Sequence, residues 1–89
     1  MILKTITIEN LKGLHARASA AFVSCADAFV ADITVKKGDM CVSGKSVMGL
    51  LMLAAGCGEN IVVTADGPDE AQAMQALQEL IARKFGEDS

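Results

Sequence analysis

The sequence predicts an α+β fold, an open-faced β-sandwich in which helices cover one face of a small sheet. Stretches with strand-like alternation and stretches with helical apolar spacing follow one another in the order β-α-β-β-α-β-α. The chain has 89 residues without an internal linker, repeat or low-complexity segment, so we expect residues 1–89 to form one domain. Hydrophobic residues make up 52% of it, with no Trp or Tyr and three Phe, so aliphatic side chains and methionine must fill the core.

The first half of the chain contains four of these elements. Residues 2–8 alternate in strand fashion, with isoleucines on one face and threonines on the other. From Ala16 to about Ala28 the pattern becomes helical, and one stripe of that helix holds Ala18, Phe22, Ala26 and Phe29. "ADITVK" returns to strand alternation, and the turn "KGD" leads into a short strand, Met40 to Val42.

The second half supplies two helices and one strand. A short helix is expected from Ser46 to about Leu53, followed by the buried strand "NIVVTA". "DGPDEAQAMQALQELIARKF" predicts the final helix, with an inner stripe of Met74, Leu77 and Ile81. Its first turn is expected to hold Pro68, Asp69 and Glu70, and its last turn Arg83 and Lys84. The element order leaves the strand pairing open, because a ferredoxin-like arrangement would share much of it.

Composition argues against several classes of function. A net charge of −3 and a pI near 4.9 do not suit nucleic-acid binding, and the scarcity of aromatic residues removes stacking platforms. The start "MILKTITIEN" is not a secretory signal, and no apolar run approaches the roughly 20 residues of a membrane span. We therefore expect a cytoplasmic protein without membrane insertion.

The three cysteines predict neither a disulfide framework nor a zinc site. Cys25, Cys41 and Cys57 are odd in number and form no C-x-x-C pair. We expect them to be small buried hydrophobes in a reducing cytosol. No metal and no cofactor is indicated.

The only histidine stands where a glycine-bearing loop meets a helix, in "LKGLHARASAAF", residues 11–22. His15 takes the N-cap position, where Ser, Thr, Asp or Asn would cap better. The first helical amides, of Ala16, Arg17 and Ala18, carry free N–H groups at the positive end of the helix dipole. The Arg17 guanidinium adds a planar donor suited to phosphate oxygens. This set could accept a phosphoryl group on histidine; a surface histidine without a role remains the open alternative.

Two other reaction classes fit less well. Ser19 lies four residues after His15, but nothing in the sequence marks an orienting acid or an oxyanion hole for hydrolysis. "SGKS", residues 43–46, ends like a phosphate-binding P-loop, yet Asp39 occupies the position where that motif requires glycine. Ser46 is instead predicted to be the N-cap of the helix that follows.

That short helix is apolar around nearly its whole circumference. Its hydrophobic residues are Val47, Met48, Leu50, Leu51, Met52 and Leu53. A deeply buried helix is one explanation, but a domain of this size has little room for it. We favour an exposed docking patch, since methionine adapts to different partners.

These motifs carry a family resemblance. "GLHARASAAF" and "SGKSVMGLLMLAAGCG", together with "TADGPDEAQAMQALQELI", resemble HPr, the histidine phosphocarrier of the bacterial phosphoenolpyruvate-dependent phosphotransferase system. The resemblance spans essentially the whole chain. It implies a four-stranded antiparallel sheet covered on one face by three helices. It also implies that the protein is a carrier rather than an enzyme, and we expect it to be a monomer.

The resemblance also implies roles for particular residues. His15 would receive phosphate from phospho-Enzyme I and pass it to an Enzyme IIA, with Arg17 steadying the phosphate. Ser46 matches a serine that a dedicated serine kinase/phosphatase modifies in many members. The partner-docking patch would be Val47, Met48 and Leu51. Lys12, Arg17 and Lys45 are expected to form a basic patch that steers acidic partner surfaces.

One position departs from the family pattern. Many relatives have proline where this chain has Ala18, so the helix start keeps one more N–H donor and loses a fixed φ. This departure suggests a subgroup such as the nitrogen-related branch. The alternative function is a non-catalytic regulatory module that binds partners through Val47–Leu51 and signals through Ser46; only the carrier needs His15.

Overall fold

The computed structural model describes residues 1–87 and contains the predicted elements in the predicted order. The strands are β1 (Ile2–Thr7), β2 (Asp32–Lys37), β3 (Met40–Ser43) and β4 (Asn60–Asp66). The helices are α1 (Ala16–Asp27), α2 (Val47–Leu53), α3 (Glu70–Ala82) and a short 3₁₀ helix, η1 (Lys84–Gly86). The α+β open-faced sandwich is therefore confirmed.

The four strands form one antiparallel sheet in the order β1-β4-β2-β3. The last strand of the chain is thus a central one, with Val63 opposite Lys4 of β1 on one side and Val35 of β2 on the other. β1 lies at an edge of the sheet. This order excludes the ferredoxin-like alternative, in which the first strand is central.

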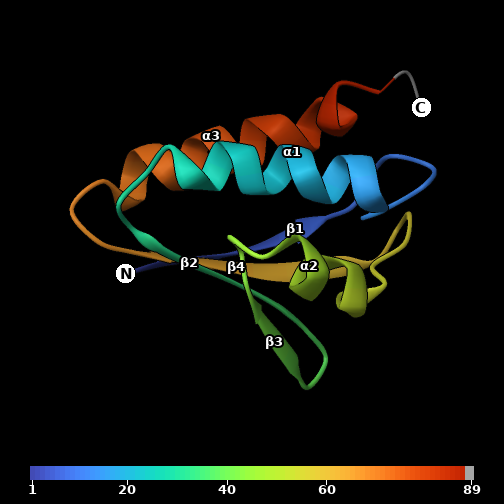
Figure 1. Ribbon diagram of the computed structural model, residues 1–89, viewed down its shortest axis with the longest axis horizontal. Coiled ribbons are helices and arrows are strands. Elements are labelled where there is room, and N and C mark those ends of the chain that lie inside the picture. The colour runs from blue at the N-terminus through green and yellow to red at the C-terminus, as the bar shows by residue number, and fades with distance from the viewer. Residues whose placement is uncertain (88–89) are drawn as a thin grey trace.

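The core lies between the sheet and the helices. α1 and α3 run side by side along one face of the sheet (Figure 1), and α2 packs against α1 and β3. Alternate residues of the central strands point into this layer and are buried, which is why those strands alternate in sequence. The predicted helical stripes are buried as well: Ala18, Phe22 and Ala26 in α1, and Met74, Leu77 and Ile81 in α3.

The end of α1 and the start of α3 differ from the predictions. Phe29 lies beyond the end of α1, partly buried against the core. Asp69 is the N-cap residue of α3 and not part of its first turn, and its carboxylate makes no capping bond to that helix. It accepts the N–H groups of Val30 (2.8 Å) and Ala31 (2.9 Å) instead. These bonds tie the α1–β2 connection to the start of α3.

The final helix is shorter than predicted. It ends at Ala82, so Arg83 and Lys84 lie outside its last turn. Lys84 and Phe85 adopt left-handed φ values of 57° and 58°, and Phe85 turns back so that only 8% of it is exposed. The burial of Phe85 compensates for a backbone conformation that side-chain-bearing residues rarely adopt.

The expectation for the cysteines is wrong at two of three positions. Cys41 and Cys57 are exposed, and only Cys25 is partly buried. Cys41 is exposed because it lies on the edge strand β3, and Cys57 because it lies in the turn before β4. Burial raises the pKa of the Cys25 thiol. None of the helices within residues 1–87 has the length and apolar character needed to cross a bilayer.

Candidate functional site

His15 caps α1 with its own ring. Its backbone is extended (φ −79°, ψ −177°), and its carbonyl oxygen accepts the Ser19 N–H at 2.8 Å, the first bond of the helix. Nδ1 of the imidazole accepts the backbone N–H of Arg17 at 3.3 Å. The prediction that His15 is the N-cap is confirmed. Its nitrogen does what a serine oxygen would do at this position, and the ring is held at the positive end of the helix.

The loop before α1 holds His15 in place. Gly13 adopts φ +65°, and its carbonyl oxygen accepts a hydrogen bond from Asn10 Nδ2 at 2.8 Å. Next to it, the Leu14 N–H donates to the carbonyl oxygen of Ala55 at 2.9 Å. A Cβ on Gly13 would lie 2.3 Å from that same oxygen. Position 13 therefore requires glycine both for its conformation and for this close approach.

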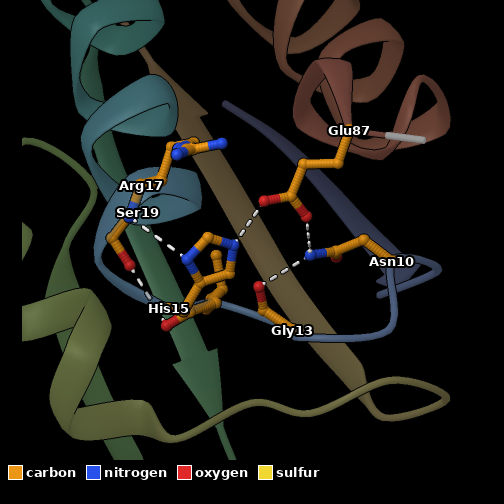
Figure 2. A network of polar contacts seen from close by, with 7 residues as sticks. Asn10, Gly13, His15, Arg17, Ser19 and Glu87 are labelled. Carbon is orange, nitrogen blue, oxygen red and sulfur yellow. Dashed lines mark hydrogen bonds and ion pairs between the residues drawn. The ribbon is translucent and has the colours of Figure 1, made fainter. Parts of the chain in front are cut away.

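The other ring nitrogen of His15 meets a carboxylate from the far end of the chain. Figure 2 shows Glu87 pointing at the imidazole from the segment after η1, with His15 Nε2 and Glu87 Oε2 2.5 Å apart. The second oxygen, Oε1, accepts a hydrogen bond from Asn10 Nδ2 at 2.8 Å. Sequence reasoning missed Glu87, and no local signal could have found it, because 72 residues separate it from His15.

The contact with Glu87 indicates which ring nitrogen of His15 carries the hydrogen. The hydrogen bond from Asn10 lowers the pKa of the Glu87 carboxyl, and the contact with His15 and the positive charge of Lys12 lower it further, against the opposing effect of burial. An ionised carboxylate can only accept hydrogen bonds, so Nε2 carries the hydrogen. Nδ1 then keeps its lone pair, directed at the first turn of α1.

The predicted phosphate-binding groups lie in and just before the first turn of α1, which His15 caps. The amides of Ala16, Arg17 and Ala18 begin the helix, where N–H groups have no partner in the preceding turn. The Arg17 side chain is exposed and extends from this first turn (Figure 2). Lys12 is exposed in the loop before α1, and its positive charge is close enough to Glu87 to lower the pKa of that carboxyl.

One predicted contribution, that of Lys45 to a basic patch, is placed elsewhere. The Lys45 ammonium donates to the Phe29 carbonyl oxygen at 2.8 Å, two residues beyond the end of α1. A helix of 12 residues is about 18 Å long, so Lys45 does not share a basic patch with Lys12 and Arg17, and that grouping is wrong. The Ser19 hydroxyl is buried and donates to the Leu14 carbonyl oxygen at 3.2 Å, not to the imidazole.

Ser46 is the N-cap of α2, as predicted. Its Oγ accepts the N–H of Gly49 at 3.0 Å, and the side chain remains partly exposed. The helix that follows is divided between two environments. Leu50 and Leu53 are buried in the core, whereas Met48 is 69% and Met52 64% exposed.

The outer face of α2 is therefore apolar and open to solvent. Val47 and Leu51 complete it, each partly exposed. We call Val47, Met48, Leu51 and Met52 the α2 patch. At the other end of this helix, the Lys37 ammonium donates to the carbonyl oxygens of Leu53 (3.2 Å) and Ala54 (3.1 Å), where a cation is favourable.

The chemistry of the site is that of a nucleophilic nitrogen beside an anion-binding helix end. Among residues 1–87, no three His, Cys, Asp or Glu side chains lie close enough together to hold a metal ion. A neutral imidazole with its free lone pair on Nδ1 can form a bond to an electrophile, and the adjacent amides and guanidinium can hold the charge of an anion such as phosphate. The fold and the site thus define a small α+β protein whose single histidine caps a helix with Nδ1 facing the first turn.

Comparison with known proteins agrees with this class. Residues 2–83 match the family model PTS-HPr, described as the PTS HPr component phosphorylation site. "Phosphocarrier protein HPr" of Neisseria meningitidis serogroup A is 51% identical over 87 residues, covering 98% of both chains. The crystal structure of HPr-C-His from Thermoanaerobacter tengcongensis superposes with a TM-score of 0.96 at 43% identity over the full length of both chains. An HPr dimer from the same organism has a TM-score of 0.79 at 44% identity, covering 98% of this chain and 100% of that one.

The chain belongs to the HPr family. Membership supports a role as a phosphocarrier of the phosphotransferase system. It also implies that the partners of this protein are components of that system, such as Enzyme I and Enzyme IIA.

Proposed function

We propose that His15 accepts a phosphoryl group on Nδ1 from phospho-Enzyme I and passes it to an Enzyme IIA. The observation that carries this proposal is the pairing of Nε2 with the ionised Glu87, which leaves the Nδ1 lone pair directed at the start of α1. In the transfer, that lone pair forms a bond to phosphorus while the bond between phosphorus and its donor breaks. Transfer onward reverses these roles.

The start of α1 is suited to hold the transferred group. Bond formation at Nδ1 ends the hydrogen bond that Nδ1 accepts from the Arg17 N–H, so this amide becomes available to a phosphate oxygen. The amides of Ala16 and Ala18 and the Arg17 guanidinium supply further donors. Ala18 contributes an N–H that a proline at this position would lack. The carrier itself needs only to present the nitrogen and neutralise charge; its partners complete the chemistry by positioning and electrostatics.

The test is incubation with Enzyme I and labelled phosphoenolpyruvate. We expect the wild type to take up phosphate that is labile in acid and stable in base, as a phosphoramidate is, and His15→Ala to take up none. Circular dichroism checks that the variant is folded, since loss of such a cap costs about 0.5–2 kcal/mol. Ser46→Ala is the matched control and should take up label as the wild type does. Acid-labile label on His15→Ala would contradict the proposal.

Docking of the phosphotransferase partners is assigned to the α2 patch, together with Lys12 and Arg17. Met48 and Met52 offer adaptable apolar surface, and the two cations favour an acidic partner. Met48→Ser should raise the KM for transfer from Enzyme I with little change in kcat. An unchanged KM would remove Met48 from the interface.

Phosphorylation of Ser46 would regulate this docking. Its Oγ lies at the positive end of α2, where an added phosphate is electrostatically favourable, but it also borders the α2 patch. We expect Ser46→Asp to keep or raise the melting temperature and to raise the KM for transfer from Enzyme I. Equal KM values for Ser46→Asp and wild type would separate Ser46 from docking.

A regulatory module without phosphotransfer is the second candidate, and the exposed methionines of α2 favour it. The labelling experiment separates the two, because a pure binding module takes up no acid-labile phosphate. A serine kinase/phosphatase as partner, a monomeric state, a cytoplasmic location and the nitrogen-related branch stay predictions. Size-exclusion chromatography with light scattering tests the monomer.

A further inference from the structure

The structure joins the two ends of the chain through one polar network at the phosphoacceptor. Asn10, from the loop after β1, donates from a single Nδ2 group to the Gly13 carbonyl oxygen and to Glu87 Oε1, each at 2.8 Å. Glu87 Oε2 faces His15 Nε2 at 2.5 Å (Figure 2). Asn10 is fully buried, and the side chain of Glu87 is only 13% exposed. A carboxylate so enclosed has few alternatives to these two partners.

The backbone around Glu87 keeps the carboxylate where it is. The Glu87 N–H donates to the Lys84 carbonyl oxygen at 2.9 Å, and the Gly86 N–H to that of Arg83 at 3.0 Å. Two residues earlier, the buried ring of Phe85 anchors the turn to the core. The segment that presents Glu87 is therefore packed and hydrogen-bonded up to the residue itself.

We propose that Glu87 is a positioning residue for the phosphoacceptor: it selects the ring form with hydrogen on Nε2 and stabilises the charge that the ring gains when Nδ1 is phosphorylated. This inference rests on the proposed function. A neutral imidazole in water divides its hydrogen between both nitrogens, and only the form with Nδ1 bare can attack phosphorus through that atom. The carboxylate accepts from Nε2–H and so favours that form.

The second effect follows from the balance of the reaction. The lone pair of Nδ1 becomes the bond to phosphorus, the hydrogen on Nε2 stays, and the donor keeps the electrons of the bond that breaks. The ring thereby becomes a cation, and its remaining N–H points at the Glu87 carboxylate. A neutral partner at position 87 would accept the same hydrogen without compensating this charge, and charge-assisted hydrogen bonds are about twice as strong as neutral ones.

Glu87→Gln tests both effects because it removes the charge and keeps the shape. Glu79→Gln is the matched control: it makes the same change in net charge on the exposed face of α3, where, within residues 1–87, the Glu79 carboxylate accepts a single bond, from the Gln75 side chain at 3.3 Å. The first measurement is the ¹⁵N chemical shifts of the His15 ring, at a pH at which the ring is neutral. The second is the phosphorylated fraction at equilibrium with Enzyme I at fixed phosphoenolpyruvate and pyruvate.

We expect the wild type and Glu79→Gln to show hydrogen on Nε2, and Glu87→Gln to show a mixture of both ring forms. The ratio of phosphorylated to unphosphorylated protein should fall about tenfold in Glu87→Gln alone. A wild-type ring that divides its hydrogen evenly, an unchanged ratio in Glu87→Gln, or an equal fall in both variants would overturn the proposal. The ring shifts need no phosphotransfer, so the role of Glu87 in selecting the ring form can fail while the carrier function stands, and the reverse.

Discussion

Replacing Gly13 by alanine should weaken the fold much more than the same change at Gly38. The two glycines have nearly equal backbone conformations, with φ +65° and φ +60°. They differ in their surroundings. A Cβ at position 13 would lie 2.3 Å from the Ala55 carbonyl oxygen and 2.8 Å from the Gly56 Cα, whereas a Cβ at position 38 meets nothing within 4 Å. The pair of variants therefore separates the effect of conformation from the effect of contact.

The expected magnitudes follow from these surroundings. A left-handed backbone conformation destabilises the folded state by about 1–2 kcal/mol when the residue is alanine. Replacing glycine also reduces the conformational entropy of the unfolded chain, which stabilises the protein by about 0.4–1 kcal/mol. Gly38→Ala should thus lower the free energy of unfolding by about 1 kcal/mol. In Gly13→Ala the loop around Ala55 must also move away, which breaks the bond from the Leu14 N–H and adds about 1–3 kcal/mol. For a chain of this size, each kcal/mol corresponds to a shift of about 4–8 °C in melting temperature.

Urea denaturation followed by circular dichroism measures both variants under the same conditions. Gly13→Ala should unfold at least about 1 kcal/mol more easily than Gly38→Ala. It should also take up phosphate more slowly, because the loop that it displaces positions His15, while Gly38→Ala should react as the wild type does. Equal stabilities would refute the argument from close contact, since the two positions share the conformational cost.

Three further predictions concern other parts of the molecule. Leu50→Ala removes a fully buried side chain and should destabilise the protein by about 2–5 kcal/mol in urea, while Met48→Ala on the exposed face of the same helix should stay within about 0.5 kcal/mol. Arg17→Lys keeps the charge and loses the planar fork, so rapid-quench measurements should show slower transfer with a smaller change in affinity for Enzyme I; a wild-type rate would reduce Arg17 to a solvated charge. Backbone N–H groups, above all that of Val30, lower the pKa of Asp69 in the folded protein below its ordinary value of 3.8. The ionised Asp69 therefore stabilises the fold above pH 3.8, and this stabilisation is lost as the pH falls below 3.8 and through the lower pKa of the folded state. Urea midpoints taken from pH 7 to pH 3 should therefore fall less steeply for Asp69→Asn than for the wild type, and parallel curves would contradict the assignment.

The parts of the fold that were predictable are those that depend on local patterns. The strands alternate because the sheet buries one face, and the burial of every second residue in β4 repeats that alternation. Ser46 and His15 were identifiable as N-caps because capping involves only neighbours within one turn. The end of α3 was not predictable from such patterns. It is set by the packing of Phe85 into the core, a tertiary contact that overrides the helical propensity of the residues around it.

The site divides in the same way. His15, Arg17 and the first amides of α1 lie within a few residues of one another, so one motif identifies them together. The partner of His15 on the other side, Glu87, depends on where the end of the chain packs. Lys45 was assigned wrongly to the basic patch for the same reason. Its ammonium is held by the carbonyl oxygen of Phe29, and this tertiary contact cannot be read from its spacing to Lys12 and Arg17 in the sequence. Contacts between distant segments leave no periodic signal in a single sequence.

The placement of Glu87 bears on how the protein can be handled. The start of β1 and the end of η1 lie toward opposite ends of the longest dimension of the molecule (Figure 1), and the Met1 ammonium is paired with Glu70 at 2.9 Å, away from His15. A purification tag or an immobilisation linker attached after residue 89 would begin three residues beyond Glu87, whose carboxylate contacts His15. A polyhistidine tag there would bring several additional imidazoles close to the one whose phosphorylation is being measured. Attachment at the amino terminus would disturb the two ion pairs of the Met1 ammonium, with Glu70 and Asp66, and leave the surroundings of His15 unchanged.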